Sequence, residues 1–322
     1  MLSPPTVSVI ICAYTEDRWS LLEDSVASVE AQTAPPVEII LCIDHNEELL
    51  RRCERRFVWG RQAKAVPLIV VANKYDGHLG SARNTAAEIA RGEVLAFLDD
   101  DAAAAVDWLE QLIAPFSDPR VAAVGGAPLP RFEKQRPRWF PREFDWVFGC
   151  AYRGLPLTRA PLAHLIGANM SARCSVLREI GGFHSDDHDD MDMCHRIAHA
   201  GHRVLYEPLA IVYHFVPATR TTWHYFWRRC YLVNRGKVEA FANMQEASSL
   251  DAELTFVART LTTGVLAEIR PVIRGDLYGL ARVGAMIAGI ALAGLGHLSG
   301  KLRLRRSRRE GRPGSGTVKT VG

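Results

Sequence analysis

The chain has 322 residues, of which 48% are hydrophobic and 23% are charged. This length accommodates one large α/β domain with an appendage, or two modest domains, and the composition excludes a disordered, collagen-like or multispan membrane protein. The net charge is only +3, but a group of cations crowds the C-terminus: Lys301, Arg303, Arg305, Arg306, Arg308, Arg309 and Arg312. The remainder is slightly acidic, which argues against a nucleic-acid partner and confines any anionic partner, such as a membrane surface, to the tail.

The cysteines and the N-terminus indicate a compartment. The seven cysteines are odd in number and widely scattered, and several lie in apolar, strand-like runs. This usage predicts reduced, buried thiols in a cytoplasmic protein. Residues 1–5 lack a basic segment followed by an apolar one, so we expect no secretory signal.

The N-terminal half alternates strand-like and helical segments. The patterns predict strands at Val7–Ala13, Val37–Ile43, Leu68–Ala72 and Val94–Leu98, and helices at Leu21–Gln32 and Ser81–Arg91. Each apolar run is short and does not alternate with polar residues, which is typical of strands buried on both faces of a parallel sheet. Ligands of such open sheets bind beyond the carboxyl ends of the strands, so the polar residues at 14–17, 44–46 and 99–101 are the first candidates for a site.

The second half is less regular. Residues 128–161 are rich in proline, arginine and aromatic side chains, which predicts irregular structure and a soft domain boundary. The elements expected after it are a loop at His164–Ser171, a helix at Cys174–Ile180, an acidic loop at Ser185–Asp190 leading into a helix that reaches Ala200, a strand at Val204–Tyr213 and a helix at Trp223–Phe241.

An apolar region follows at residues 254–298. Residues 283–300 carry no charge, and their number is close to the roughly 20 that a membrane-spanning helix needs. Five glycines dilute the hydrophobicity of this stretch, which favours a helical hairpin or an interfacial helix over a true span. Residues from about Ser307 onward are expected to be disordered.

The acidic run Asp99-Asp100-Asp101 directly follows a predicted buried strand. Such a cluster is costly unless a positive group neutralises it, and hard divalent cations bound to phosphates do so. The alternative is that the run forms the N-terminus of a helix over Ala102–Leu112. Three aspartates exceed what a helix cap needs, although both interpretations can hold.

A second acidic cluster lies immediately before a helix that contains Arg196. Its members are Asp186, Asp187, His188, Asp189, Asp190 and Asp192. Crowding of this kind raises the pKa of at least one carboxyl, which suits a general base, and the alternative is a solvated acidic loop. His214 ends an apolar run and becomes a candidate metal ligand only if it converges with Asp101.

Arg83 and Asn84 open a helix after the loop Asp76–Gly80. A glycine-containing loop that leads into a helix N-terminus can cradle phosphate. The chain has neither GxxxxGK[ST] nor GxGxxG in this position, which argues against nucleoside triphosphate hydrolases and dinucleotide-dependent dehydrogenases.

An ordered series of short motifs resembles the family 2 inverting glycosyltransferases of GT-A fold. The motifs are Val7–Tyr14, Gln32-Thr33, Val37–Ile40, Ala82–Ala86, Arg91–Glu93, Phe97–Asp101, Gly167–Ser171, Ile180–Phe183, Asp189–Met193, Arg196 and Tyr213-His214. The likeness spans about residues 6–240. Within the family, Asp99–Ala102 and Trp139–Pro156 look similar to enzymes described as glucosyl-dolichyl phosphate glucuronosyltransferases, which extend lipid-linked sugars.

The resemblance implies a fold and a division of the chain. The expected fold is α/β, with a Rossmann-like, mostly parallel open sheet flanked by helices and a helical C-terminal appendage. Residues 1–245 would be the glycosyltransferase domain, with a nucleotide-sugar half at 1–127 and an acceptor half at 128–245. Residues 246–306 would be an apolar, helical, membrane-associated region, and residues 307–322 a disordered basic tail.

The resemblance also implies roles for individual residues. Tyr14 would flank the nucleotide base, Asp44 would accept from a base N–H, and Arg83 would lie near the diphosphate, with Cys12 and Asp100 also on the donor side. Asp99, Asp101 and His214 would hold Mn²⁺ or Mg²⁺, and Asp190 would be the catalytic base. The supporting or acceptor-side residues would be Asn169, Asp189, Asp192 and Arg196.

Some positions depart from the family pattern. Thr15 stands where the family usually has Asn, and Ile43 replaces the first Asp of the usual pair. The acidic loop also offers Asp187, Asp189 and Asp192 as rival bases.

The resulting hypothesis is a metal-assisted inverting transferase. It would move a sugar from a nucleotide-sugar donor, expected to be a UDP-sugar, to a carbohydrate or polyprenyl-linked sugar acceptor in cell-envelope polysaccharide synthesis. It would work in the cytoplasm at the inner face of the cell membrane, with peripheral membrane contact through the C-terminal region and no nucleic-acid partner. The alternatives are a catalytically inactive sugar-nucleotide-binding assembly subunit and a nucleotidyltransferase, for which the acidic loop Tyr14–Asp17 is unsuited.

Overall fold

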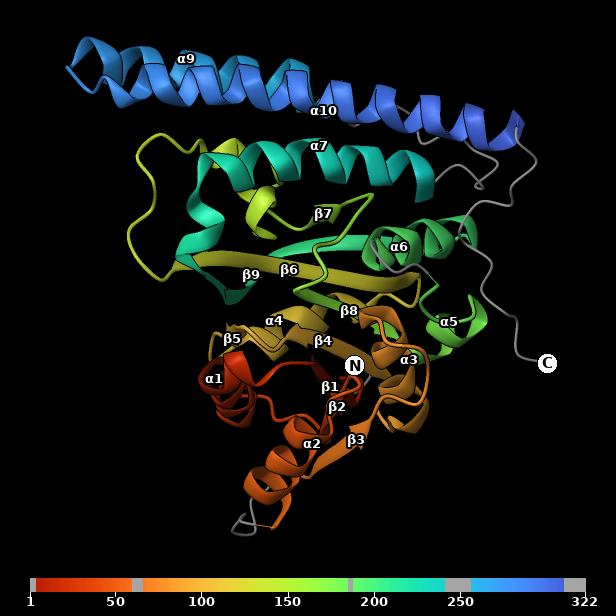
Figure 1. Cartoon of the computed structure of the whole chain (residues 1–322). Coiled ribbons are helices and arrows are strands. Elements are labelled where there is room, and N and C mark those ends of the chain that lie inside the picture. Colours follow the sequence, from red (N-terminus) through yellow and green to blue (C-terminus); the bar gives the residue numbers. More distant parts are fainter. Residues whose placement is uncertain (1–3, 60–65, 185–187, 241–255, 310–322) are drawn as a thin grey trace. The chain divides into compact units, whose positions relative to one another are not determined.

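The structure is a computed structural model that describes residues 4–59, 66–184, 188–240 and 256–309 (Figure 1). The described residues separate into two compact units. The first lies within Met1–Arg131 and Pro156–Phe215, and the second within Phe132–Leu155 and Val216–Gly322. The predicted domain boundaries at residues 127 and 245 stay a prediction.

The first unit is built on a sheet whose nine described strands run in the order β3-β2-β1-β4-β8-β6-β9-β5, with β7 paired to β9. Its first half is the predicted parallel sheet, formed by β1 (Val7–Ala13), β2 (Glu38–Ile43), β3 (Leu68–Ala72) and β4 (Val94–Asp99). β1 pairs parallel with β2 and β4, and β2 pairs parallel with β3. The four strands expected from the sequence are confirmed to within one residue at either end.

The parallel strands form because both of their faces are covered. Alternate side chains of β1 and β2, such as Ile11 and Leu41, pack with Leu22 of α1 (Trp19–Glu30) in one core cluster. The side chains between them, such as Ile10, pack with Ala82 of α3 (Leu79–Ile89) in another. Each fully buried Leu or Ile stabilises the fold by about 1.5–3 kcal/mol relative to an exposed one.

The helices expected at Leu21–Gln32 and Ser81–Arg91 are confirmed as α1 and α3, each beginning and ending two residues earlier. The helix α2 (Glu47–Cys53) was not expected from the sequence.

The other half of the sheet makes it mixed, so the expectation of a mostly parallel sheet is refined. β8 (Asn169–Arg173) pairs antiparallel with both β4 and β6 (Val121–Phe132). β9 (Arg203–Val216) pairs antiparallel with β5 (Ala102–Ala104) and β7 (Ala160–Pro161). The loop expected over 164–171 is wrong from Asn169 onward, because Asn169 is fully buried inside β8.

The helix expected directly after the acidic run is also wrong. Residues Ala102–Ala104 form β5, and α4 begins only at Trp108 (Trp108–Ile113). Alanine favours helices, but here Ala102 lies opposite His214 of β9, and the N–H of Ala104 donates to Ser28 Oγ at 2.9 Å. Tertiary pairing overrides the local preference, so the acidic run caps no helix.

The remaining described elements of the first unit complete the chain order. They are η1 (Glu16–Arg18), η2 (Glu54–Trp59), η3 (Ala114–Ser117), α5 (Cys174–Glu179) and α6 (Asp189–His199). The last two confirm the helices expected at Cys174–Ile180 and up to Ala200. All seven cysteines lie in described elements or adjacent turns, and none of them is in a disulfide.

The second unit is helical. It contains η4 (Arg142–Phe148), η5 (Ala218–Thr221), α7 (Trp223–Ala240), η7 (Phe256–Leu261), α9 (Thr262–Ile273) and α10 (Tyr278–Arg309). Its core joins Phe144, Phe148 and Phe226 to Met286 of α10. A Cβ at Gly289 would collide with Phe144, and one at Gly300 would lie 2.8 Å from the backbone oxygen of Arg235 in α7. The glycines of α10 therefore permit close packing between helices.

α9 and α10 form the expected helical hairpin. In the part of the chain that the structure describes, one helix, Tyr278–Arg306, is long and apolar enough to cross a membrane, and 28% of its most apolar stretch is buried. α10 continues to Arg309, so it includes the first three residues of the expected disordered tail. The rest of that tail, and residues 246–255 of the expected apolar region, lie outside the described residues.

Candidate active site

The predicted donor-side residues lie at one edge of the sheet, at the carboxyl ends of the parallel strands. Cys12 near the end of β1 is the register partner of Cys42 in β2 and of Asp99 in β4. Asp44 follows β2 directly. The strand topology thus brings together residues that are up to 87 positions apart in sequence.

A candidate metal centre lies at this edge. Asp99, Asp101 and His214 each offer a ligand atom, and these atoms lie within 4.8 Å of one another. His214 Nε2 is 3.1 Å from Asp101 Oδ1, and the N–H of Phe215 donates to the carbonyl of Asp101 at 2.8 Å. The pairing of β5 with β9 produces this convergence. Two carboxylates and an imidazole suit Mn²⁺ or Mg²⁺, so the residues fit a divalent cation.

The acidic run carries more negative charge than its protein neighbours neutralise. Burial raises the pKa of Asp99. Burial also raises the pKa of Asp100 to about 7, although Arg18 opposes the rise. One oxygen of Asp100, Oδ2, is buried and has no hydrogen-bond partner among the described residues. A cationic ligand would relieve this excess.

Arg18 at the end of η1 is a site residue that the sequence reasoning missed. Its Nη1 lies 2.9 Å from Asp100 Oδ1 and 3.1 Å from Asp101 Oδ2. The available signal was its place in the sequence, because it is the basic residue that ends the otherwise acidic stretch Thr15–Asp17 after β1.

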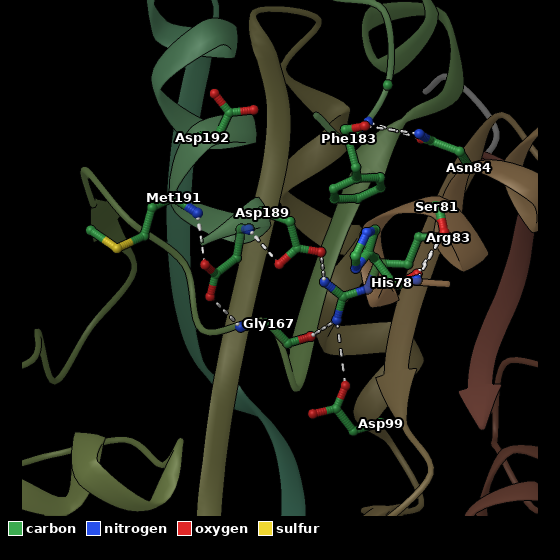
Figure 2. Close-up of polar contacts among 12 residues, drawn as sticks. His78, Ser81, Arg83, Asn84, Asp99, Gly167, Phe183, Asp189, Met191 and Asp192 are labelled. Carbon is green, nitrogen blue, oxygen red and sulfur yellow. Dashed lines mark hydrogen bonds and ion pairs between the residues drawn. The ribbon is translucent and has the colours of Figure 1, made fainter. Parts of the chain in front are cut away.

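Arg83 of α3 joins the two acidic clusters (Figure 2). Its Nη1 donates to Asp189 Oδ2 at 2.6 Å, and its Nη2 lies 2.9 Å from the carbonyl of Gly167 and 3.4 Å from Asp99 Oδ1. Burial lowers the pKa of Arg83, but the nearby carboxylates outweigh it and raise the pKa overall. The Arg83 side chain is only 3% exposed, so it is a buried link between the two acidic segments. Its role toward a diphosphate stays a prediction.

Asp190 at the start of α6 differs from its acidic neighbours. Its Oδ2 accepts from the N–H of Gly167 at 3.0 Å and its Oδ1 from the N–H of Met191 at 2.8 Å. Burial and the charge of Asp189 raise the pKa of Asp190 to about 6, against the opposing effect of Arg83. Asp189 and Asp192 are buried and paired with Arg83 and Arg196, respectively, each at 2.6 Å. From residue 189 onward, a solvated loop is therefore excluded, whereas Asp186 and Asp187 lie outside the described residues.

The region after β2 holds a second polar group. Asp44 Oδ1 accepts from Asn73 Nδ2 at 2.8 Å and lies 2.7 Å from His45 Nδ1. His45 has a positive φ of 49°, a conformation that is uncommon for residues other than glycine, although histidine, asparagine and aspartate adopt it more often than the rest. Tyr14, which is 56% exposed, directly follows Ala13, whose carbonyl accepts from the N–H of Asp44 at 2.8 Å. His45 belongs to the candidate range 44–46, whereas Asn73 was not anticipated, although it follows β3 as Asp44 follows β2.

Cys12, Asn169 and Arg196 have structural surroundings. The neighbouring Cys42 thiol and burial raise the pKa of Cys12 well above its usual value. Asn169 accepts from Trp108 Nε1 and donates to the carbonyl of Ala210, both at 2.8 Å, so it fixes the sheet interior. Arg196 donates to the carbonyl of Gly182 at 2.6 Å and holds the Gly181-Gly182 turn against α6. The supporting role expected for Asn169 and Arg196 stays a prediction.

The mixed α/β sheet with flanking helices has the GT-A fold of glycosyltransferases. Two solved structures share the fold. One is the mannosyltransferase PcManGT from Pyrobaculum calidifontis in complex with GDP-Man and Mn²⁺, with TM-score 0.61, 21% identity, and coverage of 93% of this chain and 86% of that one. The other is GalNAc-T7 with UDP, GalNAc and Mn²⁺, with TM-score 0.53, 18% identity, and coverage of 80% and 54%.

The particular family follows from the sequence comparison. The model of glycosyl transferase family 2 matches residues 8–181, which is more than half of the chain, so the chain belongs to this family and is a glycosyltransferase. It is 32% identical over 238 residues to a glucosyl-dolichyl phosphate glucuronosyltransferase of Haloferax volcanii, covering 69% of this chain and 74% of the relative. It is 33% identical over 137 residues to a pre-mycofactocin glycosyltransferase of Mycobacterium tuberculosis, of which it covers 29%.

Proposed function

We propose that the protein transfers a sugar from a nucleotide-sugar donor to an acceptor hydroxyl with inversion at the anomeric carbon. The observation that carries the proposal is the meeting of Asp99, Asp101 and His214 within 4.8 Å, tied through Arg83 to the segment that presents Asp190. Through these contacts Arg83 would link the proposed site for a cation and diphosphate to the proposed base.

The donor side is assigned to the edge of the parallel strands. Asp99, Asp101 and His214 would hold Mn²⁺ or Mg²⁺, which when bound neutralises the charge that develops on the leaving diphosphate. The exposed ring of Tyr14 and the carboxylate of Asp44 would contact the nucleotide base, with Cys12 and Asp100 nearby. UDP is our proposed nucleotide, and the structural relatives with UDP or GDP-Man and Mn²⁺ support this general donor class.

Asp190 is proposed as the catalytic base. Its carboxylate would take the proton from the acceptor hydroxyl while that oxygen bonds to the anomeric carbon and the bond from this carbon to the diphosphate breaks. The N–H groups of Gly167 and Met191 orient the carboxylate. The raised pKa of about 6 makes the Asp190 carboxylate a stronger base while still leaving it mostly ionised at neutral pH.

The acceptor is proposed to be a lipid-linked or polysaccharide-precursor sugar at the cytoplasmic face of the cell membrane. The relative named glucosyl-dolichyl phosphate glucuronosyltransferase supports this class of acceptor. A strip of exposed apolar side chains on α10 supports membrane contact: Leu280, Ile287, Leu295, Leu298 and Leu302. Their spacing of three, four, seven or eight places puts them on one helix face, and exposed Lys301, Arg303, Arg305 and Arg306 follow near its end.

The geometry of α10 favours lying on the membrane over crossing it. The opposite face of the helix packs on α7 through Gly296 and Gly300, and α7 carries Arg228, Arg229 and Arg235. A spanning α10 would draw these arginines into lipid or lose that packing, and either is costly. An apolar face with flanking cations is typical of an interfacial helix on an anionic surface.

The test is a screen of UDP-, GDP- and dTDP-sugars for thermal stabilisation and for transfer to lipid-linked sugar acceptors, with and without Mn²⁺. We expect Mn²⁺-dependent stabilisation by one nucleotide class, since a ligand at 100 times its Kd adds about 2.7 kcal/mol. Stabilisation by none of them would contradict the proposal.

A further inference from the structure

Arg18 neutralises part of the acidic run from the solvent side. Its Nη1 lies 2.9 Å from Asp100 Oδ1 and 3.1 Å from Asp101 Oδ2. Both carboxylates are only 5% exposed, whereas the Arg18 side chain is 26% exposed. The single guanidinium of Arg18 therefore forms ion pairs with two buried carboxylates.

Asp101 is shared between Arg18 and the candidate metal ligands. One of its oxygens, Oδ1, lies 3.1 Å from His214 Nε2, and the other, Oδ2, lies 3.1 Å from Arg18 Nη1. A divalent cation on Asp99, Asp101 and His214 would add two positive charges beside the guanidinium. Because like charges repel strongly in a site shielded from water, Arg18 and the cation cannot both hold Asp101 at full strength.

Arg18 is also the arginine that can leave. It also contacts Tyr14, whose hydroxyl is 3.5 Å from Nη2 and whose ring centroid is 5.4 Å from the guanidinium carbon. Tyr14 is itself exposed. Arg83 gives the contrast, since it is 3% exposed and bonded to Asp189 and Gly167. Arg18 is the more exposed of the two arginines at the acidic run, with 26% against 3% for Arg83, so its displacement disturbs less buried structure.

We propose that Arg18 is the internal counter-ion of the metal site, which holds Asp100 and Asp101 in the metal-free protein and is displaced from Asp101 when a divalent cation binds. This inference rests on the proposed metal role of Asp99, Asp101 and His214. Arg18 lowers the affinity for the free cation. A displaced arginine beside the site favours a polyanionic donor, so Arg18 couples cation binding to donor binding.

The experiment measures the Kd for Mn²⁺ without nucleotide, by the electron paramagnetic resonance signal of free Mn²⁺, for the wild type, R18Q, R18K and R56Q. Arg56 is the matched control, because it is a surface arginine, 58% exposed, that pairs with Glu23 at 2.7 Å and not with the acidic run. We expect R18Q to bind Mn²⁺ about ten-fold more tightly than the wild type, as removal of a competing ion pair implies. R18K should lie between the two, and R56Q should match the wild type.

Melting temperatures give a second readout that activity does not influence. In EDTA, R18Q should melt at a lower temperature than the wild type. Added Mn²⁺ should raise the melting temperature of R18Q by more than it raises that of the wild type. If R18Q does not fold, R18K carries the test, since a lysine ammonium lacks the guanidinium fork and should compete less well with Mn²⁺. Equal or weaker Mn²⁺ binding by the folded Arg18 variants would overturn the inference. A wild type that binds no Mn²⁺, with or without UDP, would instead refute the metal role itself.

Discussion

Replacement of Arg83 by methionine should destabilise the first unit severely. The guanidinium and its partner Asp189 are both buried, at 3% and 10% side-chain exposure, and they are 2.6 Å apart. Removing one partner of such a pair leaves an uncompensated buried charge, which costs about 3–5 kcal/mol. A typical domain has a free energy of unfolding of only about 5–15 kcal/mol. The R83M protein should therefore still fold, but with little stability left.

The double variant R83M/D189N tests the origin of this loss. The neutral amide removes the stranded charge, so the double variant should be more stable than R83M alone, by about 2 kcal/mol or more. The surface control is R120M, because Arg120 is 72% exposed and pairs with Asp118, so its loss should leave stability unchanged.

Hydrogen exchange measured by mass spectrometry suits this comparison, because it reports the opening free energy of β4 and α6 separately from that of the helical unit. If R83M loses no more protection than R120M, or if D189N restores none of it, the buried ion pair is not what holds the two acidic segments together.

Four further outcomes follow from the structure. Activity at saturating Mn²⁺ should fall about tenfold per pH unit below pH 6 as Asp190 becomes protonated. D190N should be inactive yet no less stable than the wild type at pH 7, because a carboxyl with a raised native pKa opposes folding once it ionises. A D190N enzyme with unchanged turnover would exclude Asp190 as the base. H214A should weaken Mn²⁺ binding, measured by calorimetry, by about ten-fold or more, and equal affinity would remove it from the metal site. G126A should destabilise the protein by about 1–3 kcal/mol in thermal melts, since the added Cβ would overlap the carbonyl of Ala210. G284A should instead stabilise the protein by up to about 1 kcal/mol, because Gly284 lies on a helix with open space around it. The opposite order of stabilities would contradict the packing described for these glycines. I287E on the α10 strip should reduce sedimentation of the protein with anionic vesicles. The control L157E should not, although it changes an apolar residue of the first unit that is 93% exposed. Equal vesicle binding by both variants would argue against the strip as the membrane contact.

The parallel half of the sheet could be predicted because its signal is local. The strands β1, β2, β3 and β4 are short apolar runs buried on both faces, and burial of this kind dictates composition directly. The antiparallel half carries no such signal. β8 contains buried Asn169 and Ser171, and β5 consists of three alanines, so both form through pairing with strands distant in sequence.

The same limit applies to the candidate site. Asp99, Asp101 and His214 were identified by their resemblance to family motifs, but their convergence depends on the pairing of β5 with β9. Arg18 and Asn73 went unnoticed because their significance is a distance to a carboxylate, which sequence spacing does not encode. The composition of the acidic loop likewise does not separate Asp190 from Asp189. The separation appears only once Arg83 is seen to bind one of them.

The pairing of β5 with β9 has a consequence for the order of events during synthesis of the chain. Asp101 leaves the ribosome more than a hundred residues before His214, and the strand that carries His214 must dock at β5 before the two side chains meet. A nascent or truncated chain that ends before β9 can display the whole parallel sheet and still have an incomplete cation site. If the proposed site binds Mn²⁺, tight binding would report that β9 has docked and so that the first unit has finished folding.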